Sequence, residues 1–472
     1  MSRSGELTKK TLIITVGRIS TQFITFLLLP LYTALLSTEE YGTVDLVITL
    51  VQLFIPVISL MIDQGAFRYL LNVKDDEQRK STISSSFLAL SILSIVALIV
   101  YSIVAPFIST PYKIWFILIS LVMAFSNLFL QIARGLNFTS EYALGSFVCS
   151  ASTIILNVVC IAILRMNAIG MLFATFAGNL ICCIFMFFRL HICEYIAIKS
   201  INKTNVVNQL KYSVPLVPNQ LSLWVMNSSD RLIVSFALGA AANGLLAVSH
   251  KFPAIYMTFF NIFQLAWHET GTVHYFDEDR DAFFSDMLEK VISIFSTFCL
   301  AIIVILPLVF GLFVNASYHD AYYNIPIYLI ASLFNVVIGL LGVVYVATKK
   351  TGEIAKTTIF SAVINIVVNL ILIKKIGLYA ASISTFVGYM VTMGYRIVDV
   401  KKYINIKYNI KQYLLISIIL VLGTIVYYME NMLLSIITLP VFVIIAILMN
   451  KEIVKYTIAF VSDKFLSKKD NT

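Results

Sequence analysis

The chain has 472 residues, of which 59% are hydrophobic and only 12% are charged, and its formal net charge is +9. Soluble globular proteins carry about 25% charged residues, so this composition excludes an ordinary soluble domain and indicates a protein embedded in lipid. Because the basic residues lie in short segments between apolar runs, their excess concerns membrane orientation and not nucleic-acid binding.

Apolar runs of about 20 residues follow one another along the chain, and each predicts a membrane-spanning helix because lipid offers no hydrogen-bond partner to an open backbone. Short polar turns separate the runs, and none of them is long enough to form a soluble domain. We predict an all-helical polytopic membrane protein of about 14 spans, at residues 11–36, 42–71, 82–108, 113–134, 142–164, 168–190, 210–238, 243–268, 284–314, 322–347, 354–373, 377–399, 411–429 and 432–450.

The distribution of lysine and arginine predicts the orientation. If the N-terminus lies in the cytoplasm, basic residues concentrate in the inner segments, as the positive-inside rule requires. The outer segments then carry only Lys113, Arg165, Lys374 and Lys375. This asymmetry predicts an even number of spans and places both termini in the cytoplasm.

A short internal repeat is visible at two turns. The segment from Leu35 to Gly42 is matched later by the segment from Ala237 to Gly244. Transporters are often built from such repeats, with the substrate site between the halves. We therefore expect two six-helix bundles related by a pseudo-two-fold axis along the membrane normal. The predicted divisions are an N-terminal lobe at 1–205, a second lobe at 206–405, and an extra helix pair with a basic cytoplasmic tail at 406–472.

Polar side chains recur along single faces of otherwise apolar helices. Since such a stripe faces protein or water and not lipid, several stripes facing one another predict a hydrated cavity. The first two spans of each predicted half carry the stripes, and span 113–134 adds Asn127, Gln131 and Arg134. The predicted cavity residues are Arg18, Asp45, Gln52, Asp63, Gln220, Asn227, Arg231, Lys251 and Glu269.

Two interpretations of these stripes stay open. In one, Arg18, Arg231 and Lys251 attract a phosphate or diphosphate, while the acids bind sugars or carry a coupling proton. In the other, the charges form interhelical salt bridges without a transported partner. Arg396, like Arg68, Arg134 and Arg189, lies near a predicted cytoplasmic helix end, where anchoring at the membrane interface is the simpler interpretation.

The sequence lacks the short motifs of nucleotide hydrolases, serine hydrolases and zinc enzymes. It contains no Gly-x-x-x-x-Gly-Lys-Ser/Thr phosphate loop, no Gly-x-Ser-x-Gly and no zinc-ligand spacing. We therefore expect no enzyme, no cofactor and no metal site, and transport driven by a gradient, by membrane potential or by substrate supply.

Several short motifs resemble the polysaccharide transporter family. These proteins are O-antigen and capsule repeat-unit flippases of the multidrug/oligosaccharidyl-lipid/polysaccharide exporter superfamily. The most specific match is Asn227–Ile233, which contains Asp230 and Arg231. The other matching segments are Leu29–Gly42, Asp63–Tyr69, Arg134–Leu136 and Ser249–Phe252, whereas Gly244-Leu245-Leu246 departs from the Gly-x-Tyr of the family.

The resemblance implies a two-lobed helical fold with a central cavity in the bacterial cytoplasmic (inner) membrane. The implied substrate is an oligosaccharide on a polyprenyl (undecaprenyl) diphosphate, moved from the cytoplasmic to the outer leaflet by alternating access. A proton or sodium ion for coupling, surrounding membrane lipid and the glycan polymerase machinery are the expected partners. Asp230, Arg68 and Arg134 are candidates for gating or coupling. The last helix pair would cradle the lipid tail or only stabilise the fold.

Other functions compete with this one. A flippase for a peptidoglycan precursor or a teichoic-type unit would share the fold. A multidrug cation antiporter would favour an acidic cavity, whereas the stripes mix acids with arginine and lysine. A glycan polymerase or acyltransferase usually needs a large external loop, which this chain lacks. A membrane scaffold without transport is the remaining alternative.

Overall fold

A computed structural model of the protein describes residues 26–451 apart from 72, 74, 109, 198 and 199, together with residue 455. These residues form helices and no strand, and ten of the helices they form are long and apolar enough to cross a membrane. The predicted all-helical, multi-pass architecture is confirmed. Most of the predicted span 11–36, including Arg18, lies outside the described residues.

The chain divides into two compact units, which are described separately. Unit 1 comprises Met1–Val248 with Leu372–Leu378, and unit 2 comprises Ser249–Ile371 with Tyr379–Thr472. Unit 1 extends beyond residue 205 because α11 packs against α3. The predicted lobes at 1–205, 206–405 and 406–472 describe an internal repeat and stay a prediction.

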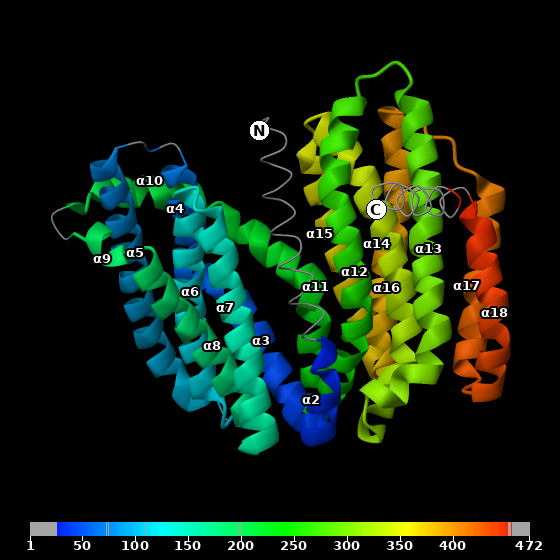
Figure 1. The fold of residues 1–472 in the computed structure, drawn as a ribbon, viewed down its shortest axis with the longest axis horizontal. Helices are drawn as coiled ribbons and strands as arrows, with labels where there is room; N and C mark the ends of the chain where they lie inside the picture. Colours follow the sequence, from blue (N-terminus) through cyan, green and yellow to red (C-terminus); the bar gives the residue numbers. More distant parts are fainter. Residues whose placement is uncertain are drawn as a thin grey trace, which may run out of the picture. The chain divides into compact units, whose positions relative to one another are not determined.

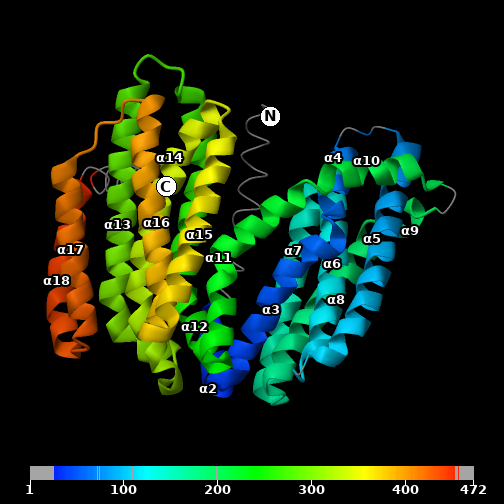
Figure 2. The same cartoon turned by 180° about the vertical axis from the view of Figure 1, so that it is seen from behind.

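Unit 1 is a bundle in which α6, α7 and α8 pack side by side and α3 packs against α6. Short α10 lies across the end of the unit at which α4 ends (Figures 1 and 2). Its helices are α2 Leu29–Leu35, α3 Thr38–Ser59, α4 Ile62–Leu70, α5 Asp76–Val104, α6 Lys113–Gly135, α7 Thr139–Asn157 with a π-helical extension Val158–Ile163, α8 Asn167–Arg189, α9 Ile192–Tyr195, α10 Lys203–Ser213, α11 Leu216–Leu238 and the first turns of α12 Ala240–His274.

Two predicted continuous spans are interrupted. The span 42–71 breaks at Leu60 and Met61, whose φ angles of 46° and 53° are left-handed. This conformation costs L-residues about 1–2 kcal/mol each, and neither residue type signals it. The span 210–238 breaks at Val214 and Pro215, between α10 and α11. Proline explains this second break, since it lacks the backbone N–H and its ring clashes with the preceding turn.

The start of α3 touches the start of α12 backbone to backbone. A Cβ atom at Gly42 would lie 1.8 Å from the carbonyl oxygen of Ala240, and one at Gly244 would lie 2.0 Å from that of Thr38. Only glycine allows this approach. The two turns that the sequence repeats are therefore in direct contact within unit 1.

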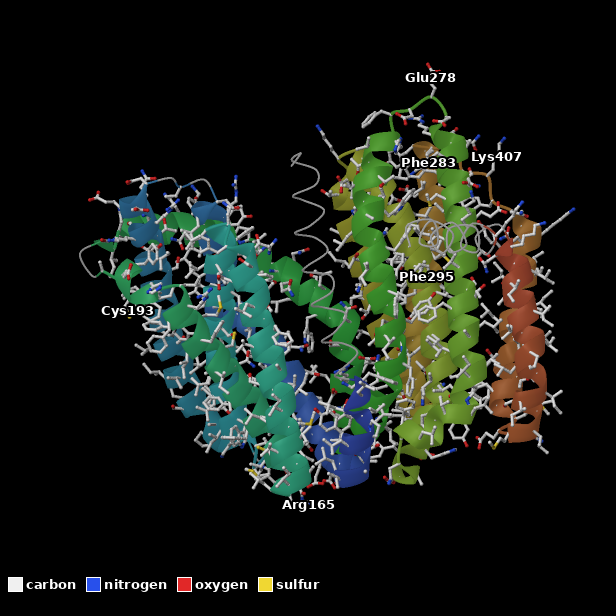
Figure 3. All side chains as sticks on the ribbon, in the orientation of Figure 1. Arg165, Cys193, Glu278, Phe283, Phe295 and Lys407 are labelled. Carbon is white, nitrogen blue, oxygen red and sulfur yellow. The ribbon has the colours of Figure 1, made fainter. Side chains whose placement is uncertain are left out.

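Unit 2 is built around α14, the most buried of its helices, which packs against α13 and α16. Phe283 and Phe295 lie along α13 (Figure 3). Their rings contact aromatic residues of α12, namely Trp267 and Phe260. The elements after α12 are α13 Arg280–Phe313, a 3₁₀ segment Ala316–Asn324, α14 Ile325–Ala347, α15 Thr351–Ile376, α16 Tyr379–Asp399, α17 Ile410–Tyr428 and α18 Met432–Met449.

The structure corrects the interpretation of Arg396 as an anchor at the membrane interface. Its side chain is buried, with only 3% of the residue exposed. Nη1 of Arg396 donates to the carbonyl oxygen of Ile338 at 2.8 Å. Nε and Nη2 of Arg396 donate to the hydroxyl oxygen of Thr357. Because a buried guanidinium must be satisfied by hydrogen bonds, this arginine ties α14, α15 and α16 together.

Within unit 2, a tyrosine pair joins α17 to the 3₁₀ segment before α14. The rings of Tyr322 and Tyr427 stack with their centres 4.0 Å apart, and each hydroxyl donates to the carbonyl oxygen of the other residue, at 3.0 and 2.8 Å.

We expect Tyr427→Ala to destabilise the protein by about 3–5 kcal/mol, because a buried aromatic ring is removed. Thermal unfolding in detergent measures this. The exposed Tyr428, which donates to the carbonyl oxygen of Tyr323, supplies the control Tyr428→Phe, and equal effects of both changes would contradict the assignment.

Candidate functional site

Unit 1 contains a polar cavity of about 460 Å³. This volume is typical of small-molecule sites, which measure roughly 300–1,000 Å³. The cavity lies between α3, α4, α6 and α11. Its lining residues are Gln52, Ile55, Pro56, Ser59, Met61, Asp63, Gln64, Met123, Asn127, Gln131, Gln220, Leu223, Trp224, Asn227 and Ser228.

Helical periodicity brings most of these side chains to the cavity. On α11, Gln220, Trp224 and Asn227 are spaced by three or four residues and share one face. Asn127 and Gln131 do the same on α6. The stripes predicted from the sequence on these helices therefore meet in one place, although substrate binding by Gln52, Asp63, Gln220 and Asn227 stays a prediction.

The break after α3 forms one wall of the cavity. Ser59 accepts a hydrogen bond at its hydroxyl from the backbone N–H of Met61, at 3.1 Å, and this bond supports the left-handed turn. Asp63 then follows in the first turn of α4 and accepts a hydrogen bond from the side-chain amide of Gln64 at 2.7 Å. Both side chains line the cavity, so among the described residues the carboxylate of Asp63 is paired with an amide.

Trp224 is a cavity residue that the sequence interpretation missed. Its indole N–H donates to the carbonyl oxygen of Thr49 at 3.0 Å, across α11 and α3, and the residue is 9% exposed. The signal was present, because Trp224 lies one helical turn after Gln220 and one before Asn227.

Arg231 and Asp45 form an ion pair in place of lining the cavity. Nη1 of Arg231 lies 2.8 Å from Oδ1 of Asp45 and 3.3 Å from the hydroxyl of Thr49. Asn243 of α12 donates to the second carboxylate oxygen at 3.3 Å and to the carbonyl oxygen of Gly42 at 2.8 Å. This network joins α3, α11 and α12 at the contact between the two glycines.

The three gating or coupling candidates lie apart from this network or at its edge. Asp230 is buried and accepts a hydrogen bond from the backbone N–H of Arg231 at 2.9 Å. Arg134 is exposed, and its guanidinium lies 4.4 Å from the ring centre of Phe67. Arg68 is exposed on α4. Their roles in gating stay predictions.

The remaining predicted residues belong to other parts of the chain. Lys251 and Glu269 lie on the part of α12 that belongs to unit 2, where Lys251 is half-buried and Glu269 is exposed. Arg18 lies outside the described residues. Over the described part of the chain, no group of three or more His, Cys, Asp or Glu side chains could hold a metal ion.

Residues 7–267 match a family described as polysaccharide biosynthesis protein. The match covers more than half of the sequence, so the chain belongs to this family, and the predicted membership of the polysaccharide transporters is confirmed. The comparison with curated proteins gives no match.

Solved structures with the same fold are transporters. An inward-facing multidrug resistance MATE family transporter of the MOP superfamily has a TM-score of 0.68 and 15% identity, covering 82% of this chain and 98% of its own. The lipid II flippase MurJ, in an inward closed conformation, has a TM-score of 0.68 and 14% identity, covering 95% of this chain and 100% of its own. A MOP superfamily transporter from Pyrococcus furiosus has a TM-score of 0.56 and 14% identity, covering 84% and 95%. These structures share the fold of this chain, and the family match places the chain among the polysaccharide biosynthesis proteins.

Proposed function

We propose that the protein is a flippase for a polyprenyl-diphosphate-linked oligosaccharide repeat unit of a surface polysaccharide such as capsule or O-antigen. It moves the unit from the cytoplasmic to the outer leaflet by alternating access. The observation that carries this proposal is the polar cavity of a chain in the polysaccharide biosynthesis family. Two of the helices that line it, α3 and α6, are long and apolar enough to cross a membrane. Polar side chains at membrane depth are costly unless water, protein or substrate satisfies them.

The chemistry of the substrate explains why such a cavity is needed. A lipid-linked oligosaccharide carries hydroxyl and phosphate groups that cannot cross hydrocarbon without losing their hydrogen bonds. Amides and a carboxylate along the path replace those bonds while the lipid chain stays in the bilayer. The predicted cations Arg18, Arg231 and Lys251 would meet the diphosphate, and Arg231 would then exchange its bond to Asp45 for one to phosphate.

The proposed orientation places both termini in the cytoplasm of a bacterium and the protein in its inner membrane. In unit 1, Arg165 lies at the end opposite α10 (Figure 3). In unit 2, Glu278 and Lys407 lie together at one end of that unit (Figure 3). Both arrangements agree with the alternation of inner and outer segments that the basic residues predict.

Alternating access requires the outer side to close while the cavity is open inward. The starts of α3 and α12, which carry the contact of Gly42 with Gly244, lie at the end of unit 1 opposite α10 (Figures 1 and 2). In the proposed orientation this is the outer end, and the Arg231–Asp45 pair joins α11 to the start of α3 there. We propose that this contact is the closed outer gate, and that outward opening separates the starts of α3 and α12. Coupling to a proton or sodium ion, with Asp63 as the proton carrier, and contact with the polymerase machinery belong to the same proposal.

Complementation in cells tests the proposed substrate class. We expect this chain, produced in a strain without its own repeat-unit flippase, to restore surface glycan and to prevent the lipid-linked unit from accumulating on the cytoplasmic leaflet. The measurement combines membrane level of the protein, surface glycan and leaflet-resolved precursor. Normal protein level with unchanged precursor accumulation, across strains with different repeat units, would contradict the proposal.

A peptidoglycan-precursor flippase is the second candidate, since the similarity to MurJ extends over 95% of this chain. Rescue of cells depleted of their lipid II flippase, without rescue of any surface polysaccharide, would favour it. A multidrug cation antiporter is the third candidate, and export of cationic dyes by the same cells would favour that function.

A further inference from the structure

We propose that the cavity of unit 1 is a subsite for an uncharged sugar of the repeat unit, in which carboxamide side chains bind the sugar hydroxyls and Trp224 packs against a face of the ring. This inference rests on the proposed flippase function and narrows its substrate to units that present a neutral hexose or an N-acetylhexosamine. It separates recognition of the sugar from recognition of the diphosphate.

Carboxamides are the dominant polar groups of the cavity. Each offers two N–H donors and a carbonyl acceptor, so it can bind a hydroxyl group in either direction. Since an amide is uncharged, it binds a neutral ligand without leaving a charge unpaired. The carboxamides come from α3, α4, α6 and α11, and they are Gln52, Gln64, Asn127, Gln131, Gln220 and Asn227.

Several of these amides are available to a ligand. Within the part of the chain that the structure describes, the side chains of Gln52, Asn127 and Gln220 make no hydrogen bond to protein, whereas Asn227 donates to the carbonyl oxygen of Leu223 at 2.9 Å. An amide at membrane depth must find a partner. Because α3, α6 and α11 each supply one available amide to the same cavity, water or a polyhydroxylated ligand has to satisfy all three.

Trp224 supplies the apolar part of the site. Sugar rings present C–H groups on one face, which pack well against a flat aromatic ring. The hydrogen bond from the indole N–H to the carbonyl oxygen of Thr49 fixes the ring orientation, at 3.0 Å. The ring therefore serves as a rigid surface between Gln220 and Asn227, as a sugar with polar edges and an apolar face requires.

The charge of the cavity selects against acidic sugars. Asp63 is the one carboxylate among the described lining residues, and it can accept hydrogen bonds from hydroxyls. The lining residues described here include no lysine or arginine, and Arg231 of α11 is paired with Asp45. Among the described lining residues, a uronic acid would meet the carboxylate of Asp63 and no compensating cation. A neutral sugar meets no such repulsion.

Purified protein in vesicles tests the subsite with two substrates that share one polyprenyl diphosphate, one carrying a neutral disaccharide and the other a disaccharide that ends in a uronic acid. We expect the wild type to flip the neutral substrate at least about tenfold faster, since like charges at close range cost several-fold or more in affinity. Gln220→Ala and Asn127→Ala should each slow the neutral substrate about three- to tenfold, the loss typical of one hydrogen bond. Gln220→Asn should restore part of the rate.

The controls distinguish failure of the proposed subsite from failure of the proposed flippase function. Ser222→Ala changes α11 at a residue outside the cavity and should keep the wild-type rate. Trp224→Phe keeps an aromatic face and should lose less activity than Trp224→Ala. If the wild type flips neither substrate, the proposed function fails. If it flips both equally well, and both alanine variants keep the wild-type rate at normal protein level, the subsite is wrong while the flippase function stands.

Discussion

Gly42→Ala is expected to reduce transport by at least about tenfold, because the added Cβ atom would lie 1.8 Å from the carbonyl oxygen of Ala240 and 2.5 Å from the backbone nitrogen of Gly244. Both obstacles are backbone atoms, so α3 and α12 must move apart to accept the methyl group. The change therefore acts on the contact that we propose as the outer gate. Surface glycan and the leaflet distribution of the lipid-linked unit measure the effect.

Gly394→Ala is the matched control, since a Cβ atom at Gly394 meets nothing within 4 Å. A thiol-accessibility assay on cysteines introduced near the start of α3 should report greater exposure from outside in Gly42→Ala than in the control. If Gly42→Ala transports at the wild-type rate with normal protein level, the starts of α3 and α12 need no close approach. That outcome would contradict the proposed gate.

The second large effect concerns the Arg231–Asp45 pair. Among the described residues, Arg231→Ala leaves Asp45 with the amide of Asn243 as its hydrogen-bond partner. Leaving a half-buried carboxylate without its cation costs about 1–3 kcal/mol. The variant also removes one cation predicted to bind the diphosphate. We expect transport to fall by at least about tenfold and the protein level to fall moderately.

A neutral pair distinguishes the two causes. In the double variant Asp45→Asn with Arg231→Gln, amides replace both charges and can still bond to each other, so the helices stay joined and the protein level should recover. Transport should remain low, because a diphosphate needs positive charge for tight binding. Recovery of transport together with protein level would mean that Arg231 only holds α3 and α11 together.

The sequence was sufficient for the features that depend on composition and periodicity. Apolar runs predicted the helices, since lipid forces each run to satisfy its own backbone. The stripe on α11 predicted that Gln220 and Asn227 share a face, and both line one cavity with Gln52 and Asp63. These inferences succeed because a helical period relates residues that are close in the chain.

Features that depend on tertiary contacts could not be predicted in the same way. Two stripes contained Asp45 and Arg231, yet nothing in the sequence indicates that these residues pair with each other and not with a substrate. The buried Arg396 resembles an interface anchor until the carbonyl of Ile338 is seen beside it. The break at Leu60 and Met61 has no marker residue, since neither leucine nor methionine favours the left-handed conformation that both adopt.

Transport by the purified protein is the most direct test of the central claim. The protein is reconstituted into vesicles with a polyprenyl-diphosphate-linked saccharide, and an enzyme or lectin added outside reports how fast the saccharide crosses between leaflets. We predict that the protein accelerates this crossing, while the double variant Asp45→Asn with Arg231→Gln does not. An unaccelerated crossing by folded wild-type protein, under every imposed proton, sodium and voltage gradient and with both neutral and acidic saccharides, would contradict the assignment as a lipid-linked saccharide flippase.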